Sequence, residues 1–281
     1  MSDKTFYNLG ARGHDITTAA GFEDLAAKLA SQRMPNVQLA LGKSFPNLPT
    51  EGANLSPGFG TYVKNILGQK NIQVAILSCY INMIHPDEAV RDELLSKFEA
   101  YVKYARYFGA PMVASETGGV FPEIKYTEEN FTPAAFAKVV SSVKRLAQAG
   151  EKYQTFIGVE PGRNHPIYSL SKMQELLTKV NSDYVGVVLD PTNLISGETY
   201  LEQVTLVEKA FAMFGDKIIA FHLKDFVVTE TGGIKPVNFG DGVMKRDEIL
   251  KIIARHKPYL PIILEETKDD ALGNAMATVN G

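Results

Sequence analysis

The sequence predicts one domain, residues 1–281, with an α/β fold of the (β/α)8 TIM-barrel type. Short apolar runs alternate with longer amphipathic stretches, and together they make eight β-then-α units of roughly 35 residues each. No linker separates the units, and such alternation implies a parallel sheet with right-handed crossover connections. An open sheet that binds a dinucleotide is disfavoured, because no G-x-G-x-x-G motif follows the first strand.

Apolar runs and amphipathic stretches give the expected elements in order. The strands are expected over residues 6–9, 36–42, 72–82, 111–119, 156–162, 185–193, 218–226 and 261–267. The helices are expected over 21–34, 60–70, 87–108, 132–150, 169–182, 200–215, 244–257 and 269–279. Gly109 predicts a helix end, whereas Thr132 and Pro133 predict a helix start, because Thr can cap the first turn and Pro fits within it.

Composition and charge disfavour several classes of protein. The formal net charge of -3 supplies no general attraction for a polyanion, which argues against nucleic-acid binding. Cys79 is the only cysteine, so no intrachain disulfide can form, as suits a reducing cytosol. The N-terminal stretch lacks the layout of a signal peptide, and no apolar run approaches the ~20 residues that span a bilayer. We therefore expect a cytoplasmic protein that does not bind membranes.

Ionisable side chains end four consecutive strands of the predicted barrel. Glu160, Asp190 and His222 end the fifth, sixth and seventh apolar runs, and Glu265 and Glu266 end the eighth. In a closed barrel these ends converge on one face, where barrel enzymes place their function. Alternation along the strand leaves open which of Glu265 and Glu266 points inward.

One divalent metal ion would account for this set of residues. Carboxylates gathered at the ends of buried strands repel one another and are costly to desolvate, and a cation removes both problems. A ligand set of several oxygens and one nitrogen favours Mn²⁺, Mg²⁺ or Co²⁺ and also admits Zn²⁺. Each residue alone has a plainer interpretation, as a solvated loop acid or a hydrogen-bonded structural histidine. Four such residues at successive strand ends nevertheless indicate a metal site.

The motifs around these residues resemble the sugar phosphate isomerase/epimerase family of xylose isomerase-like TIM barrels. The resemblance covers about residues 70–267 and rests on LSCYIN, HPDE, ASETGG, FIGVEPGRNHP, VVLDPTN, AFHLKDF, FGDG and PIILEE. It implies metal ligation by Glu160, Asp190, His222 and Glu265. The last assignment follows the family's P-x-x-x-E ending, which Pro261 and Glu265 match.

The resemblance also implies a reaction. Members with known reactions use the two ligating glutamates as an acid/base pair, so Glu160 and Glu265 are the expected catalytic residues. The expected chemistry is proton abstraction next to the carbonyl of a sugar or sugar phosphate, through an enediolate that the metal stabilises. The chain departs from the pattern at Asn193, where several ketose 3-epimerases have His.

Other residues near the predicted strand ends are candidate substrate contacts. Asn82, Glu116 and His165 are expected to bind substrate hydroxyls. Lys224 is expected higher in the barrel mouth than His222, where it holds a substrate oxygen or balances the charge of the site. The loop 227–242 contains Gly-Gly and Gly-Asp-Gly, which predicts a small hairpin that acts as a lid; the alternative is an ordinary surface insertion.

Neither phosphorylation of the substrate nor the oligomeric state follows from the sequence. Arg12, Lys43 and Arg163 lie near predicted strand ends, where each could contact a phosphate or be a solvated charge. A homodimer is the working expectation.

Three other functions remain as alternatives. A metal-dependent lyase, such as a dehydratase of a cyclic hydroxy-ketone, would share the proton abstraction step. A non-catalytic sugar-binding protein would not need two opposed glutamates. An endonuclease that cuts at abasic sites shares this barrel, but it calls for more metal-binding histidines and a basic groove, and this chain has only 5 histidines.

Overall fold

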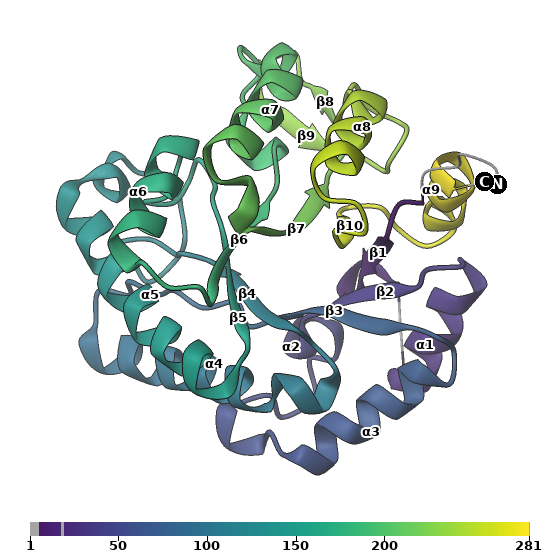
Figure 1. The fold of residues 1–281 in the computed structure, drawn as a ribbon, viewed down its shortest axis with the longest axis horizontal. Helices are drawn as coiled ribbons and strands as arrows, with labels where there is room; N and C mark the ends of the chain where they lie inside the picture. The colour runs from purple at the N-terminus through teal and green to yellow at the C-terminus, as the bar shows by residue number, and fades with distance from the viewer. Residues whose placement is uncertain (1–5, 18–19, 281) are drawn as a thin grey trace.

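Eight parallel strands close into one barrel in the computed structural model, which describes residues 6–17 and 20–280. Around the barrel the strands follow the order β1-β10-β7-β6-β5-β4-β3-β2 (Figure 1). Their bounds are Leu9–Arg12 (β1), Asn36–Leu39 (β2), Gln73–Ser78 (β3), Met112–Glu116 (β4), Phe156–Glu160 (β5), Val185–Leu189 (β6), Ile218–Leu223 (β7) and Ile262–Leu264 (β10). This closure confirms the predicted (β/α)8 barrel.

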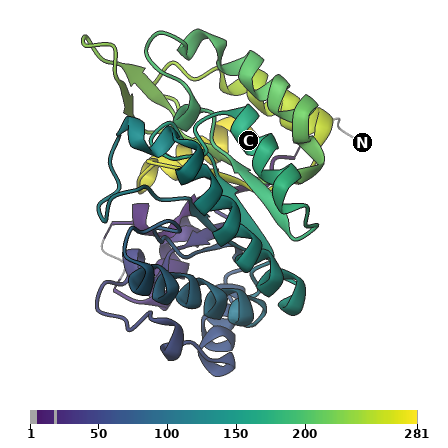
Figure 2. The same cartoon turned by 90° about the vertical axis from the view of Figure 1, so that its left-hand side faces the viewer.

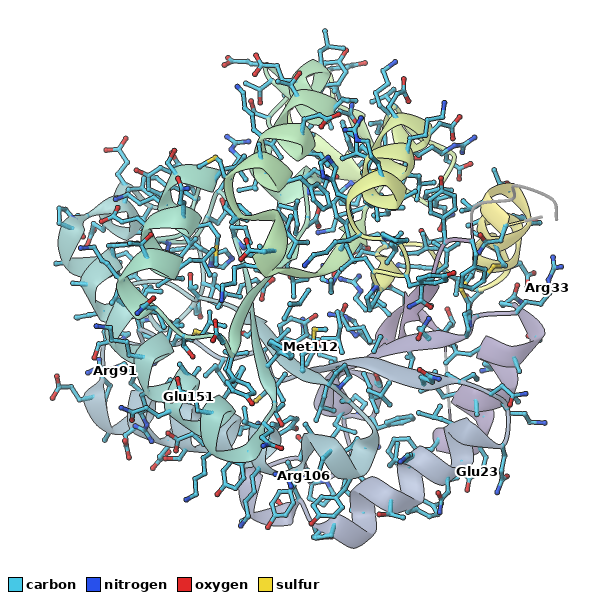
Figure 3. All side chains as sticks on the ribbon, viewed as in Figure 1. Glu23, Arg33, Arg91, Arg106, Met112 and Glu151 are labelled. Atoms are coloured by element: carbon cyan, nitrogen blue, oxygen red, sulfur yellow. The ribbon has the colours of Figure 1, made fainter. Side chains whose placement is uncertain are left out.

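Helices surround the strands (Figure 1). Their bounds are Phe22–Ser31 (α1), Leu41–Ser44 (α2), Pro57–Gly68 (α3), Glu88–Phe108 (α4), Pro133–Tyr153 (α5), Leu170–Val180 (α6), Gln203–Phe214 (α7), Arg246–His256 (α8) and Asp270–Asn280 (α9). Charged side chains such as Glu23, Arg91 and Glu151 lie on the outer helices, whereas Met112 lies at the centre of the barrel (Figure 3). Within the described part of the chain, none of the helices has the length and apolar character to cross a membrane.

Apolar side chains pack in two layers. Inside the barrel, Ile76, Met112, Val188 and Ile263 pack with small alanines. A larger layer between the strands and the helices buries side chains such as Phe98, each contributing about 1.5–3 kcal/mol relative to exposure. Because side chains fill the barrel, a functional site has room only at the strand ends.

Two helix boundaries follow the predicted local signals. Thr132 Oγ1 accepts a hydrogen bond from the N–H of Ala135 at 3.2 Å, and Pro133 occupies the first turn of α5. Gly109 ends α4 with a φ of 75°, in the left-handed region that glycine adopts without Cβ strain. The local chemistry of these positions therefore determines where α5 begins and where α4 ends.

The predicted position of the first strand is wrong. The prediction began at Phe6, but β1 begins at Leu9, and Phe6 is 53% exposed. Leu9 and Ala11 are buried and pair with β10, so burial between two neighbouring strands sets the register. The other strands begin within one residue of the prediction but end three or more residues sooner in most cases, because the chain leaves the sheet for the loops at their carboxyl ends.

The loop after β7 forms the predicted hairpin. Its strands Phe226–Val228 (β8) and Ile234–Pro236 (β9) pair antiparallel, and the hairpin projects beyond the barrel (Figure 2). At its tip Gly232 lies against Gly197 of the loop after β6. A Cβ on Gly197 would lie 2.0 Å from the Gly232 carbonyl oxygen, so this close approach requires glycine.

The buried carboxylate of Asp225 holds the base of the hairpin. It accepts hydrogen bonds of 2.8–3.2 Å from four backbone N–H groups, those of Phe226, Gly240, Gly242 and Met244. One side chain thus ties together both ends of the segment that follows β7.

Candidate metal centre and its cavity

Four ionisable side chains meet at the carboxyl ends of neighbouring strands. Glu160 is the last residue of β5, Asp190 follows β6, His222 lies near the end of β7, and Glu265 follows β10. Each offers one ligand atom, and these atoms lie within 4.8 Å of one another. All four residues are buried, with 4% exposure at most. The structure therefore brings together the four residues that the sequence predicted to hold a metal.

The imidazole of His222 lies between two carboxylates. Its Nδ1 is 3.5 Å from Glu160 Oε1 and 3.3 Å from Glu265 Oε1. Both ring nitrogens are buried, and neither has a hydrogen-bond partner among the residues that the structure describes. Buried polar atoms are normally hydrogen bonded, so an unpartnered nitrogen facing carboxylate oxygens has the character of a metal ligand. The residues present fit a divalent cation.

Lys224 reaches into this cluster. Its Nζ lies 2.8 Å from Asp190 Oδ2 and 2.8 Å from Glu265 Oε2 as ion pairs, and it donates a hydrogen bond to Asn193 Oδ1 at 2.9 Å. Asn193 Nδ2 in turn donates to Glu160 Oε1 at 2.7 Å. The ammonium group balances two of the three carboxylates, and Asn193 connects it to the third.

Burial and neighbouring charges give the two glutamates opposite pKa shifts. Burial raises the pKa of Glu160 to about 7, against the attraction of His222. Burial also disfavours the ionised form of Glu265, but His222, Lys224 and Arg12 outweigh it and hold the pKa of Glu265 below its ordinary value. At His222, burial is outweighed by the two glutamates, which raise its pKa to about 9. Such a separation is typical of an acid/base pair.

The contacts of Arg12 distinguish the two glutamates of the eighth strand. Glu265 is 3% exposed, and its Oε1 lies 3.4 Å from Arg12 Nη1. The side chain of Glu266 is 36% exposed and pairs with Arg12 Nη2 at 2.7 Å. Arg12 also donates to both carboxylate oxygens of Asp15 at 2.8 Å. The residue at the centre is therefore Glu265, as the P-x-x-x-E ending implied.

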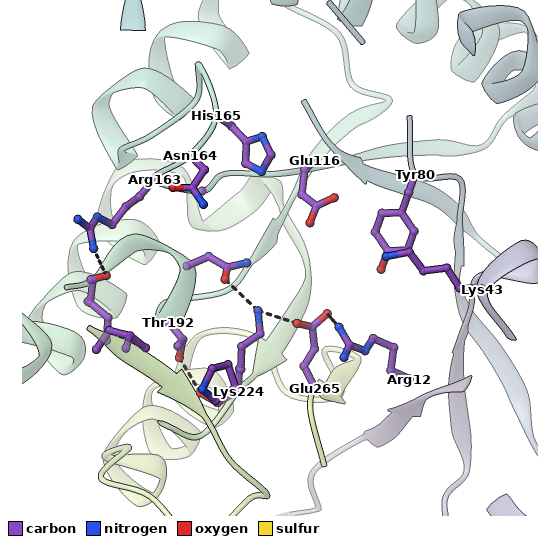
Figure 4. Close-up of a pocket in the computed structure, with 15 residues that line it drawn as sticks. Arg12, Lys43, Tyr80, Glu116, Arg163, Asn164, His165, Thr192, Lys224 and Glu265 are labelled. Carbon is purple, nitrogen blue, oxygen red and sulfur yellow. Dashed lines mark hydrogen bonds and ion pairs between the residues drawn. The ribbon is translucent and has the colours of Figure 1, made fainter. Parts of the chain in front are cut away.

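A cavity of about 410 Å³ opens onto this centre (Figure 4). Among the predicted site residues, Glu116, His165, Lys224 and Glu265 line it. Its wall also includes Arg12, Lys43, Tyr80, Arg163, Thr192 and Asn193. Ile234 and Pro236 of the hairpin complete the wall, so the segment expected to act as a lid does contact the cavity.

Asn82, predicted to bind a substrate hydroxyl, is not among the described residues that line this cavity. Its Nδ2 donates to the carbonyls of Gly119 and Phe121 at 2.9 and 2.8 Å. Its Oδ1 accepts from the N–H groups of Ile84 and Gly119, both at 3.1 Å. These contacts hold the loops after β3 and β4 together.

Sequence reasoning did not find the part played by Thr192. Its N–H donates to Asp190 Oδ1 at 2.8 Å, and its Oγ1 donates to the carbonyl of Lys224 at 2.6 Å. Thr192 thus orients Asp190 and joins the loops after β6 and β7. The D-P-T-N run carried a signal for the first contact, since an Asp carboxylate commonly accepts from the backbone two residues on.

Fold and site together define a barrel of the kind that places a carboxylate-rich centre at the ends of its parallel strands. The sequence model of the xylose isomerase-like TIM barrel family matches residues 37–279, and the chain belongs to this family. No curated protein matches the chain by sequence.

Solved structures share the fold at low identity. The probable 3-DHS dehydratase AsbF from Bacillus anthracis, involved in petrobactin synthesis, is 16% identical with a TM-score of 0.75, over 98% of this chain and 99% of its own. The 3-keto-D-glucoside 4-epimerase YcjR from E. coli is 13% identical with a TM-score of 0.71, over 98% and 99%. The IolI protein, solved with a zinc atom, is 14% identical with a TM-score of 0.72, over 97% and 96%.

Proposed function

We propose that the chain is a divalent-metal-dependent isomerase or epimerase of a sugar or sugar phosphate. The observation that carries this proposal is the pair of buried glutamates, Glu160 and Glu265, whose carboxylates lie 3.5 and 3.3 Å from Nδ1 of one imidazole, that of His222. Abstraction and return of a proton next to a carbonyl need one group that accepts it and one that donates it. The epimerase activity named for YcjR, which has the same fold, supports this choice.

The metal would be held by Glu160, Asp190, His222 and Glu265. When bound, it supplies a Lewis acid that stabilises the negative charge developing on the substrate's carbonyl oxygen. Lys224 and Asn193 keep the carboxylates in place by the contacts described above. The hairpin residues Ile234 and Pro236 would contact the substrate and help to exclude water.

The two glutamates would divide the proton transfers. A carboxylate oxygen of one glutamate takes the proton from the carbon next to the carbonyl, and the other glutamate returns a proton to the enediolate. Donation to the opposite face of the same carbon gives an epimer. Donation to the former carbonyl carbon, with the proton of the neighbouring hydroxyl passing to the carbonyl oxygen, gives an isomer.

A metal-dependent dehydratase is the second candidate. It is supported by the ammonium of Lys224, which lines the cavity beside Glu265 and would stabilise negative charge on a departing hydroxyl group. The dehydratase activity named for AsbF, which has the same fold, agrees with this alternative. An elimination releases water and leaves a new carbon–carbon double bond, whereas an isomerase or epimerase leaves the substrate's composition unchanged.

Deuterium exchange tests the proposal. The purified protein, supplied with Mn²⁺, is incubated in D2O with a panel of ketoses and ketose phosphates, and NMR follows deuterium at carbons next to the carbonyl. We expect exchange with at least one compound, without loss of water. Water loss would favour the dehydratase, and no exchange with any compound would favour a binding protein.

Matched variants connect the reaction to the glutamates. Glu160→Gln and Glu265→Gln keep the side-chain shape but remove the basic oxygen, so each is expected to slow exchange by at least about 10²-fold. Glu266→Gln is the control, because Glu266 is the neighbouring glutamate and pairs with Arg12 outside the centre. Equal losses in all three variants would contradict the assigned roles.

A further inference from the structure

Besides Lys224, which is paired with Asp190 and Glu265, three cationic residues line the cavity, and two of them have partners within the chain. Arg12 is held by Asp15 and Glu266. Arg163 Nη1 donates to the carbonyl of Ile195 at 2.9 Å, and its guanidinium points away from the centre (Figure 4). Arg12 is thus engaged by carboxylates, whereas Arg163 has one donor bound to a carbonyl and its guanidinium is directed away from the centre.

Lys43 differs from both. It lies in the short α2 directly after β2 and lines the cavity. Its Nζ lies 4.1 Å from the centroid of the Tyr80 ring. Within residues 6–17 and 20–280, no carboxylate or carbonyl accepts a hydrogen bond or forms an ion pair with this ammonium group. Lys43 therefore presents a positive charge without an anionic partner at the cavity wall.

The hydroxyl of Tyr80 adds a second donor beside it. Gln38 Nε2 donates a hydrogen bond to this hydroxyl at 2.9 Å and another to Ser78 Oγ at 3.0 Å. The first of these bonds orients the side chain of Tyr80. The hydroxyl's own hydrogen has no acceptor in the part of the chain that the structure describes. Figure 4 shows Tyr80 and Lys43 together on one side of the cavity, with Glu116 between Tyr80 and His165.

The charges on this side of the cavity are mixed: cations dominate at His14, whereas at Tyr80 burial and the carboxylates of Glu265, Glu160 and Glu116 raise the pKa of the hydroxyl. The ring of His14 lies edge-on to Tyr80, with the ring centroids 6.2 Å apart. Burial, followed by the charges of Arg12 and Lys43, lowers the pKa of His14 to about 4, despite the opposing effect of Glu265 and Glu266. The nearby cations therefore outweigh the nearby carboxylates at this ring.

We propose that Lys43 Nζ and the Tyr80 hydroxyl bind an oxyanion of the substrate, a carboxylate or a phosphate. The ammonium group of Lys43 and the hydroxyl of Tyr80 are two hydrogen-bond donors without an acceptor in the described chain. Such donors, one of them charged, recognise an oxyanion by charge-assisted hydrogen bonds. This proposal rests on the proposed function, in which the reacting carbons of the substrate lie over Glu160 and Glu265. The substrate is then an acidic or phosphorylated polyhydroxy carbonyl compound rather than a neutral sugar.

Calorimetric titration of the full chain, in the metal state in which it is purified, tests the subsite. The probes are D-fructose 6-phosphate for a phosphate, 5-keto-D-gluconate for a carboxylate, and D-fructose as the neutral reference. We expect at least one anionic probe to bind more tightly than D-fructose, and the preferred one identifies the anion. Lys43→Met should weaken that binding on the order of tenfold, and Tyr80→Phe by a few-fold, with D-fructose binding unchanged.

Lys138→Met is the matched control, because Lys138 is exposed on the outer helix α5. It should bind every probe as the unmodified chain does. The subsite is refuted if no anionic probe is preferred, or if Lys43→Met binds both anions normally. This outcome is separable from the proposed reaction: exchange with neutral ketoses alone would keep the reaction and remove the subsite. Anion binding that depends on Lys43, without deuterium exchange in any compound, would support the subsite and contradict the proposed reaction.

Discussion

Asn193 connects the two halves of the candidate centre. Its amide donates to Glu160 and accepts from Lys224, so a single side chain orients a glutamate and an ammonium group. Asn193→Leu keeps a similar volume and removes both hydrogen bonds. We expect it to slow deuterium exchange about 10–100-fold, as is usual when a partner that orients metal ligands is lost.

The matched control for this variant is Asn164→Leu. Asn164 also lines the cavity, but its side chain makes no hydrogen bond to the described residues. Its exchange rate should stay within a few-fold of the unmodified chain. Equal rates for the two leucine variants would show that the hydrogen bonds of Asn193 do not contribute to the reaction.

His14 predicts a loss of stability in acid. Its pKa is lowered to about 4 in the folded chain, against 6.5 ordinarily, so the unfolded chain takes up the proton first. The contribution of the neutral His14 ring to the free energy of unfolding is fully present above pH 6.5 and is lost as the pH falls toward 4. His14→Phe should therefore lose less stability between pH 7 and pH 4.5. Urea unfolding at both pH values measures the difference, and parallel losses would contradict the prediction.

The sequence allowed the candidate metal-binding set to be predicted because each member lies at the end of an apolar run. Strand alternation also predicted that Lys224 shares a face with His222. It could not predict the ion pairs of Lys224, since a long flexible side chain can reach several partners. Nor could it assign Asp225, whose acceptor role depends on N–H groups up to 19 residues further along the chain.

At the scale of the element, the hairpin after β7 depends on one buried carboxylate. Asp225→Ala leaves four backbone N–H groups without their acceptor. We expect a loss of about 2–4 kcal/mol in the free energy of unfolding, together with faster proteolytic cleavage between β8 and β9. Urea unfolding and limited proteolysis measure the two effects.

Asp241→Ala provides the comparison for the hairpin, because Asp241 lies in the same segment and is exposed. It should change the free energy of unfolding by no more than about 0.5 kcal/mol. If the two alanine variants unfold alike, the carboxylate of Asp225 does not anchor the hairpin.

Element types were easier to predict than element limits. The Gly-Gly and Gly-Asp-Gly positions predicted a hairpin after β7, and Thr132 and Gly109 predicted helix ends, since these signals act locally. The first strand was misplaced because the aromatic ring of Phe6 resembles a strand residue in sequence. Only the pairing of Leu9 and Ala11 with β10, at the other end of the chain, determines which residues enter the barrel.

At the scale of the whole molecule, the proposed metal would join four strands of the barrel. A ligand that binds only the folded chain stabilises it by about 2.7 kcal/mol when present at 100 times its Kd. We therefore expect Mn²⁺ to raise the Tm and a chelator to lower it. Differential scanning calorimetry measures both, and elemental analysis gives the metal content.

Variants at the centre distinguish this effect from general stabilisation by salts. His222→Ala should lower the bound metal and abolish the rise in Tm. Glu116→Gln changes a cavity carboxylate outside the four-residue set, so this variant should keep both the bound metal and the rise in Tm with Mn²⁺. An unchanged metal response in His222→Ala would contradict the ligand assignment.

The order of the strands has a consequence for how the chain matures. Glu265 follows β10, and β10 completes the barrel by pairing with β7 on one side and β1 on the other. During synthesis Glu160, Asp190 and His222 leave the ribosome before Glu265, which follows the last strand. Pairing between strands that are far apart in sequence slows folding, because the entropy of closing the intervening chain is lost before the contacts form. The four candidate ligands therefore come together only when β10 pairs with β7 and β1, and an unfinished chain lacks the fourth of them.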